Sequence, residues 1–283
     1  MRIGIFGLNT HASAEPEAGL RLVRLAEELG YESLWAGEHV VLPSPRVAPA
    51  PLEPTDPIID PLVWLAFVAA ATSRVKLGTG IIILPQRNPL VLAKQAASVD
   101  VLSRGRLILG VGAGYLEPEM SALGVSMRER GSRTDEHLAV MRAIWTAPAP
   151  VSFHGRYSDF AGIDAHPRPA QAGGPPIVVG GRSPGAHRRA VASGHGWYGF
   201  MLSDEATAEQ MAASRLAAAE VPRPDHLGPL EISITPAGPL DAERVRALAD
   251  LGVDRLILHP GALDPDAIEA YLQQHAALID IER

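Results

Sequence analysis

The stretch that decides the fold runs from residue 75 to residue 115. It reads VKLGTGIIILPQRNP over 75–89, continues through a helix-length segment at 90–103, and closes with GRLILGVGAGY over 105–115. Two apolar runs joined by such a segment predict a parallel βαβ unit, because parallel strands need a long crossover between them. Both runs carry glycines near their ends, where a backbone can approach a ligand closely. We therefore expect a binding site at these strand ends, as is usual for parallel α/β folds.

The same alternation of strand and helix continues to both ends of the chain. Strands are expected near 3–6, 32–36, 75–84, 105–112, 175–181, 196–200, 231–235 and 255–259, and helices near 15–29, 62–72, 90–103, 128–145, 184–193, 204–219, 240–251 and 264–280. Eight of each predict an α/β fold of the (β/α)8 TIM-barrel type. A barrel takes about 250 residues, so the length suits a single domain over 1–283. A doubly wound open sheet is the alternative, but no Gly-x-Gly-x-x-Gly turn follows the first strand.

Two segments interrupt this alternation. Residues 151–160 alternate like a short hairpin that turns at His154-Gly155, and residues 43–61 after the second strand form a proline-rich loop. The loop is too long for a passive connector in a compact domain, so we expect it to act as a lid over the site.

Composition excludes several classes of function. Without cysteine there are no disulfides, thiolate metal sites or cysteine nucleophiles, and a cytoplasmic location is favoured. A net charge of −7 and the lack of a basic stripe argue against nucleic-acid binding. No run of about 18 apolar residues and no signal peptide are seen, so no membrane partner is expected. The histidines show no metal-ligand spacing, and no metal is expected.

Two glycine-rich turns are candidate cofactor contacts. Gly112, Ala113 and Gly114 follow a strand and expose N–H groups that can hold a phosphate or the edge of a flavin-like ring, although a tight turn explains them equally well. Gly180, Gly181, Arg182 and Ser183 follow another strand and lead into a helix whose amino end favours an anion. Positive charge at Arg182, in an acidic chain, points to an anionic cofactor tail.

Glu38 and His39 close the second strand at the barrel end where chemistry occurs. His39 can relay a proton near neutral pH, and the alternative is a surface pair between His39 and Glu38. Gly80 and Ile81 lie inside the third strand, where a glycine marks either a close backbone approach or simple barrel curvature.

Other residues are interpreted as structural. We expect Trp64, Phe67 and Trp145 in the core, the helix over 62–72 to be buried on more than one side, and Glu119 to form a structural ion pair with Arg133.

The chain resembles the luciferase-like monooxygenase superfamily, in particular its coenzyme F420-dependent oxidoreductase branch. The likeness covers nearly the whole chain and rests on the order and spacing of five motifs. They are Trp35-Ala36-Gly37-Glu38-His39; Leu77-Gly78-Thr79-Gly80-Ile81 with Pro85 and Asn88-Pro89; Asp100-Val101-Leu102-Ser103-Arg104-Gly105-Arg106; Gly110-Val111-Gly112-Ala113-Gly114-Tyr115; and Pro176-Ile177-Val178-Val179-Gly180-Gly181 with Gly196-Trp197.

The resemblance implies a TIM barrel that binds FMN or the deazaflavin F420 at its carboxyl end and works as a homodimer. It implies a non-proline cis peptide at Gly80-Ile81 that backs the cofactor ring, with Gly112, Ala113, Gly114, Gly180, Gly181, Arg182 and Ser183 around the ribityl chain and phosphate. It assigns His39 as proton relay or substrate anchor and Glu38 as a hydrogen-bond partner of the ring. The expected dimer surfaces are the helices over 62–72 and 90–103.

Two departures limit the transfer of family roles. Tyr115 stands where the sugar-phosphate dehydrogenases of this branch have a glutamate acid, so their substrate and proton donor are not transferred. His195 stands where an aspartate is common before Gly196-Trp197, which leaves the contacts of that strand open.

These features lead to three hypotheses. The first is an F420-dependent oxidoreductase that transfers a hydride between the deazaflavin and a small organic substrate. The second is an FMN-dependent monooxygenase on the same fold that uses reduced flavin and oxygen, and the third is a non-redox barrel.

Overall fold

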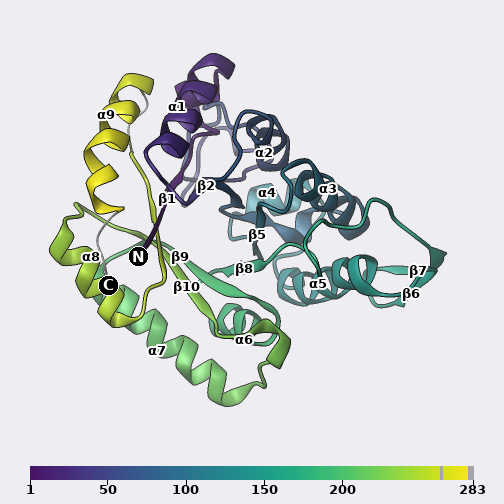
Figure 1. Cartoon of the computed structure of the whole chain (residues 1–283). Coiled ribbons are helices and arrows are strands. Elements are labelled where there is room, and N and C mark those ends of the chain that lie inside the picture. Colours follow the sequence, from purple (N-terminus) through teal and green to yellow (C-terminus); the bar gives the residue numbers. More distant parts are fainter. Residues whose placement is uncertain (262–263, 280–283) are drawn as a thin grey trace.

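Eight parallel strands close into a barrel in the computed structural model, which describes residues 1–261 and 264–279 (Figure 1). The barrel closes because β1 pairs with both β2 and β11, while β3 pairs with both β2 and β5. In chain order its strands are β1 (Arg2–Phe6), β2 (Ser33–Ala36), β3 (Lys76–Thr79), β5 (Leu107–Gly112), β8 (Ile177–Gly180), β9 (Gly196–Leu202), β10 (Glu231–Pro236) and β11 (Arg255–Leu258). The predicted TIM barrel is confirmed.

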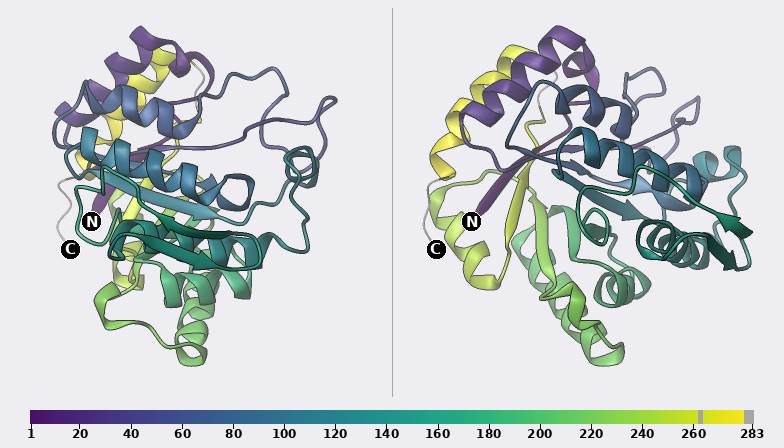
Figure 2. Two further views of the ribbon diagram at one scale, coloured as in Figure 1. Left: turned by 90° about the vertical axis from the view of Figure 1, so that its right-hand side faces the viewer. Right: turned by 45° about the vertical axis from the view of Figure 1, so that its right-hand side comes forward.

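Helices surround the barrel and alternate with its strands (Figure 2). They are α1 (Pro16–Glu28), α2 (Pro61–Ala69), α3 (Pro89–Leu102), α4 (Glu117–Ala122), α5 (Arg130–Thr146), α6 (Pro184–Ser193), α7 (Asp204–Glu220), α8 (Ala242–Leu251) and α9 (Pro265–His275). The short strand β4 (Ile82–Ile83) follows β3, and the predicted hairpin is present as β6 (Val151–His154) and β7 (Asp159–Ile163). Residue 280, the last of the predicted final helix, lies outside the described residues. No helix of the described ranges is long and apolar enough to cross a bilayer.

Helix starts follow from short polar side chains placed before proline. The carboxylate of Asp60 accepts hydrogen bonds from the backbone N–H groups of Leu62 and Val63, and Asn88 does the same at the start of α3. In each case the next residue is a proline, whose fixed φ suits the first helical turn and whose missing N–H costs no hydrogen bond there.

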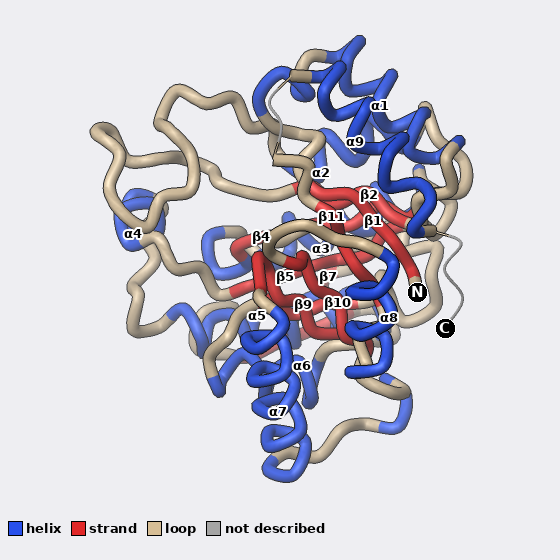
Figure 3. Tube along the Cα trace, turned by 90° about the vertical axis from the view of Figure 1, so that its left-hand side faces the viewer, coloured by secondary structure: helices blue, strands red, loops and turns tan. Residues whose placement is uncertain are grey.

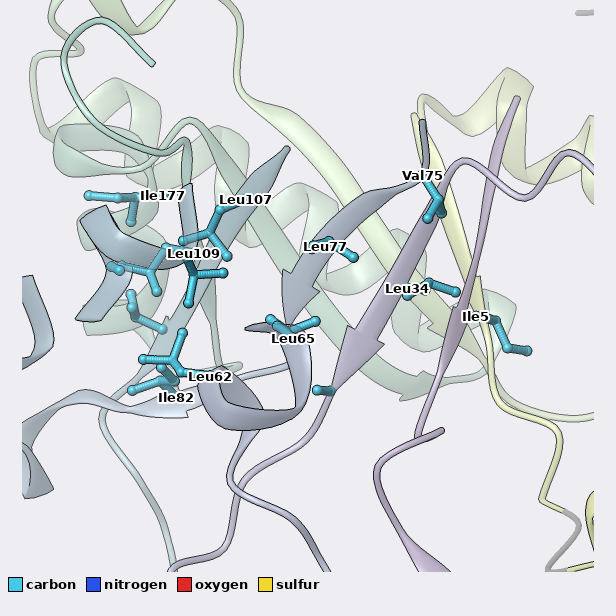
Figure 4. Close-up of a cluster of buried hydrophobic side chains, with 14 of the residues drawn as sticks. Ile5, Leu34, Leu62, Leu65, Val75, Leu77, Ile82, Leu107, Leu109 and Ile177 are labelled. Carbon is cyan, nitrogen blue, oxygen red and sulfur yellow. The ribbon is translucent and has the colours of Figure 1, made fainter. Parts of the chain in front are cut away.

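Apolar side chains form two separate layers. Residues that point outward from the strands pack against the helices, as shown for Leu34, Leu77, Leu107 and Ile177 with Leu65 of α2 (Figure 4). The inward layer fills the barrel itself with Trp35, Ile108, Val178, Tyr198 and Ile257, and Phe6 and Ile81 pack against it. The barrel is therefore a packed core up to the level of Phe6 and Ile81, and we call its carboxyl end beyond these residues the mouth.

The helix over 62–72 is not buried on more than one side as expected. Trp64 is buried, but Val63 and Phe67 are 62% and 45% exposed. Trp64 and Leu65 face the interior, so the opposite residues of α2 face outward although they are apolar. The core assignment is confirmed for Trp64 and Trp145 and wrong for Phe67.

Two long segments rise from the same end of the barrel. Figure 3 shows the loop that follows β2 and the segment that carries α4 extending together beyond the strands. The base of the first loop is held by backbone hydrogen bonds from His11 to Pro57 and from Ile59 to Asn9, each 2.9 Å. These segments follow β2 and β5, so they border the carboxyl ends of the strands.

Candidate active site at the carboxyl ends of the strands

A main-chain ledge lies where β3 ends. The peptide bond between Gly80 and Ile81 is cis, as the resemblance predicted, and it separates β3 from β4. The Gly80 N–H donates to the carbonyl of Ala36 at 2.7 Å, which keeps this ledge beside the end of β2. The ledge therefore lies beside the end of β2, which Glu38 and His39 follow in the chain.

The glycines of β5 and β8 make room for the Ile81 side chain. A Cβ atom on Gly112 would lie 1.9 Å from Ile81 Cδ1, and one on Gly180 would lie 3.0 Å from it. Real side-chain carbons do not approach this closely, so only glycine fits at Gly112 while Ile81 holds its place. Sequence reasoning left the approach of a ligand and a tight turn open as explanations of Gly112, and the structure adds packing against Ile81 as a reason for both glycines.

His39 contacts two side chains of the segment after β5. Its Nδ1 lies 2.7 Å from Oε2 of Glu119 on α4, and its Nε2 lies 3.3 Å from the hydroxyl of Tyr115. Only 8% of the His39 side chain is exposed, and the Glu119 side chain is fully buried. The other carboxylate oxygen of Glu119 accepts the Val40 N–H at 2.6 Å. A shielded imidazole with a carboxylate behind it and a phenol in front is suited to moving a proton.

The expected ion pair between Glu119 and Arg133 is wrong, because the Arg133 guanidinium lies over the ring of Tyr157 at 4.9 Å and Glu119 pairs with His39 instead. The alternative that His39 pairs with Glu38 is also not observed. The partner of His39 is 80 positions away in sequence. The visible signal was an acidic residue in the segment directly after a glycine-ended strand, where barrel enzymes place functional groups.

Glu38 is held from both sides of its carboxylate. Oε2 accepts the backbone N–H of Ile83 at 2.6 Å, and Oε1 accepts Nε of Arg87 at 2.8 Å and also its Nη2. Arg87 reaches on to Asp60, the residue that caps α2. Burial raises the pKa of the Glu38 carboxyl above its ordinary value, and the positive charge of Arg87 opposes this rise. Arg87, which sequence reasoning missed, thus links the ends of β2 and β4 to the start of α2.

The second glycine-rich turn lies at the end of β8. The Ser183 hydroxyl accepts the Ala186 N–H at 3.2 Å and caps α6, as its sequence predicted. Arg182 donates from Nη2 to the carbonyl oxygens of Phe200 and Met201, at 2.5 and 3.4 Å. The Arg182 side chain is therefore held at the carboxyl end of β9, close to the amino end of α6.

Three rings gather at the mouth from strands far apart in sequence. The ring of Phe6 lies 5.0 Å from that of Phe200 and 5.3 Å from that of His259, measured between centroids. Phe6 also fills the space beside Gly37 and Gly80, where added Cβ atoms would lie 2.9 Å from it. Phe200 is 39% exposed, so this side of the mouth offers an aromatic surface.

The opposite end of the barrel is charged but internally paired. A cavity of about 180 Å³ there is lined by residues that include Arg2, Glu231 and Arg255. Arg255 bonds Glu32 at 2.9 Å and also Glu231, which accepts Arg2 at 2.7 Å. His195, whose contacts were open, lies at this end and accepts the Ile177 N–H at 3.0 Å. Such pairing stabilises the barrel base rather than serving chemistry.

Across residues 1–261 and 264–279, no group of three or more histidine, cysteine or acidic side chains is placed to hold an ion.

Comparison with known proteins agrees with this fold. The sequence profile of the luciferase-like monooxygenase family matches residues 1–276. A 4-hydroxyprotoasukamycin monooxygenase from Streptomyces nodosus subsp. asukaensis is 32% identical over 160 residues, which are 56% of this chain and 40% of that relative. The chain spans less than two thirds of the length of the first curated relatives it matches, for example 40%, 64% and 46%.

Two solved structures share the fold over almost the whole chain. The monooxygenase RslO1 from Streptomyces bottropensis has a TM-score of 0.75 at 25% identity, with 99% of this chain and 98% of that chain covered. An F420-dependent secondary alcohol dehydrogenase in complex with an F420–acetone adduct has a TM-score of 0.79 at 18% identity, with 99% of both chains covered.

Proposed function

Because the chain belongs to the luciferase-like monooxygenase family, we propose that it is a flavin- or deazaflavin-dependent oxidoreductase. Within that class, the proposed cofactor is coenzyme F420 and the proposed reaction is hydride transfer to or from a small organic substrate. The observation that carries the proposal is the shielded His39 beside the Gly80–Ile81 ledge at the carboxyl end of the barrel. TIM-barrel enzymes keep their chemistry at this end.

The groups at the strand ends fit the parts of such a cofactor. The Gly80–Ile81 ledge can support one face of a tricyclic ring, and His39 follows the neighbouring strand. Arg182 and the amino end of α6 supply positive charge and N–H donors for an anionic tail. The described contacts of Arg182 use only Nη2, which leaves its other donors for a phosphate or carboxylate.

The chain's own residues orient the reactants and handle the proton. A bound deazaflavin supplies the hydride chemistry. The His39 side chain is shielded from bulk water and its Nε2 lies 3.3 Å from the Tyr115 hydroxyl, so we assign His39 to giving a proton to the substrate or taking one from it. Both carboxylate oxygens of Glu38 are engaged by Ile83 and Arg87, so we assign Glu38 to holding the end of β2 rather than to the ring.

The alternative is an FMN-dependent monooxygenase that uses reduced flavin and oxygen. It is favoured by the names of two of the similar proteins, both monooxygenases. An FMN enzyme would have the same fold, and the Gly80–Ile81 ledge and Arg182 would make the same contacts with its cofactor. The identity of the bound cofactor therefore distinguishes the two functions.

Titration of the purified protein with F420 and, separately, with FMN tests the proposal. Micromolar or tighter binding of F420, with FMN bound at least tenfold more weakly, is the expected result. The reverse order establishes the FMN alternative. Binding of neither cofactor rejects both and favours a non-redox barrel.

We also propose that the protein works as a homodimer in the cytoplasm. Val63 and Phe67 of α2 and Val91 of α3 are 62%, 45% and 56% exposed. The two helices pack side by side, so these side chains lie on neighbouring elements, next to an apolar groove of about 200 Å³ that Val63 and Phe67 help to line. Exposed apolar surface of this kind marks interaction sites.

The lack of cysteine suits a reducing compartment, which supports the proposed cytoplasmic location. The loop over 43–61 is the proposed lid.

A further inference from the structure

We propose that Glu119 is a positioning residue that fixes the tautomer of His39, and that Tyr115 is the catalytic residue that exchanges a proton with the substrate oxygen. The substrate then carries a hydroxyl or carbonyl group at the reacting carbon. This inference rests on the proposed function, which by itself names only His39 as the proton carrier.

The position of Glu119 defines which nitrogen of His39 carries the proton. Its Oε2 lies 2.7 Å from Nδ1, and an ionised carboxylate only accepts hydrogen bonds, so Nδ1 is the N–H. Its Oε1 accepts the Val40 N–H at 2.6 Å, which fixes the orientation of the carboxylate. The Glu119 side chain is fully buried, so no water competes for these contacts. In the neutral ring, the lone pair is therefore on Nε2.

Tyr115 completes the line of groups on the side that faces the mouth. Its hydroxyl lies 3.3 Å from Nε2, and the two rings meet edge to face at 5.9 Å. Nε2 carries a lone pair, so the phenol donates its proton to it. Partial burial raises the pKa of Tyr115, and the charge of Glu119 adds to the rise, so the phenol stays protonated at neutral pH. Tyr115 is 50% exposed, whereas His39 is shielded, so a substrate meets Tyr115 first.

The three groups allow a proton to move in two short transfers. In alcohol oxidation, the substrate hydroxyl gives its proton to the Tyr115 oxygen while the Tyr115 proton moves to Nε2 of His39. The imidazolium that forms is stabilised by the Glu119 carboxylate. The two transfers together move one proton from the substrate to His39, and no electron pair is transferred among these residues; a bound two-electron cofactor would take up the hydride. Carbonyl reduction reverses each transfer.

The tyrosine at position 115 limits which reacting group the substrate can carry. A neutral phenol stabilises an oxygen that gains or loses a proton, as in an alcohol–carbonyl pair. It offers no positive charge for a phosphate or carboxylate at the reacting carbon, and Glu119 behind it repels anions. The reacting group is therefore an uncharged hydroxyl or carbonyl.

The tautomer is tested without cofactor by the ¹⁵N chemical shifts of His39 at pH 8. The wild type is expected to show Nδ1–H. In Glu119→Gln the amide can donate to Nδ1 and still accept from Val40, so the ring is expected to switch to Nε2–H. Glu117→Gln, on the same helix but exposed, is the matched control and should keep the wild-type shifts. Identical shifts in all three proteins would overturn the positioning role.

The role of Tyr115 is tested on the F420-loaded protein. A panel of primary and secondary alcohols and the matching carbonyl compounds serves as probe, and deazaflavin absorbance follows hydride transfer. Tyr115→Phe is expected to lower kcat by about 10²–10⁴ while KM changes little, because general acid–base catalysis contributes that much. An unchanged kcat, or no turnover of any probe by loaded wild type, overturns the inference. Absence of F420 binding instead rejects the proposed function, and the ¹⁵N shifts still decide the role of Glu119.

Discussion

Removing Arg87 should cost this protein a large part of its stability. Arg87→Ala leaves the Glu38 carboxylate, whose side chain is 1% exposed, without its positive partner, and it also releases Asp60 at the start of α2. Removing one partner of a buried ion pair costs about 3–5 kcal/mol, since the other charge stays in a poorly solvated place. For a chain of this size that corresponds to a fall in Tm of about 6–20 °C. Equilibrium unfolding in urea at pH 8 measures the difference.

The stability lost in Arg87→Ala should become smaller as the pH falls. Burial already raises the pKa of Glu38 in the folded protein, and loss of Arg87 removes the main opposing influence. A carboxyl whose folded pKa is raised binds a proton more readily in the folded than in the unfolded chain. Lowering the pH from 8 toward 5 therefore stabilises Arg87→Ala relative to the wild type. The unfolding free energies of the two proteins should converge as Glu38 takes up its proton.

Two further variants make this reasoning refutable. Glu38→Gln combined with Arg87→Ala should be more stable than Arg87→Ala alone at pH 8, because no charge is left buried. Arg46→Ala breaks a pair with Glu53 whose side chains are 43% and 55% exposed, and it should cost about 0–1 kcal/mol. A loss in Arg87→Ala no larger than in this control, or one that stays constant from pH 8 to pH 5, contradicts the account.

Three other outcomes are expected. Gly112→Ala should lower the free energy of unfolding by about 1–3 kcal/mol through overpacking. Adding Ile81→Val should recover most of this loss, because it removes the Cδ1 atom that a Gly112 Cβ would meet at 1.9 Å. Equilibrium unfolding of the single and the double variant measures both effects. Val63→Glu with Phe67→Glu should give a monomer in sedimentation velocity while the wild type is a dimer, and a monomeric wild type removes the dimer proposal. Arg182→Ala should weaken F420 binding by about 10- to 100-fold, the worth of one charge-assisted hydrogen bond, whereas Arg188→Ala, in an exposed pair with Glu220, should not.

The sequence by itself determined the barrel and the end of it where the candidate site lies. Alternating apolar runs and helix-length segments encode backbone periodicity, which is a local property, and the observed strands follow them closely. The glycines after β3, β5 and β8 marked the carboxyl ends, and the family likeness gave the cis peptide between Gly80 and Ile81.

Only the tertiary structure decided which side chains act together. Glu119 and His39 are 80 positions apart, and Arg87 and Glu38 are 49 positions apart, so no spacing rule joins them. Each pair forms because loops after different strands converge over one end of the barrel and exclude water from charged groups that then need a partner. The same holds for Gly112, whose lack of a side chain is explained by Ile81 between β3 and β4. The period of a helix or strand can be recognised from residues that are close in sequence. The partners in a site depend on distances between residues that come together only after the barrel has closed.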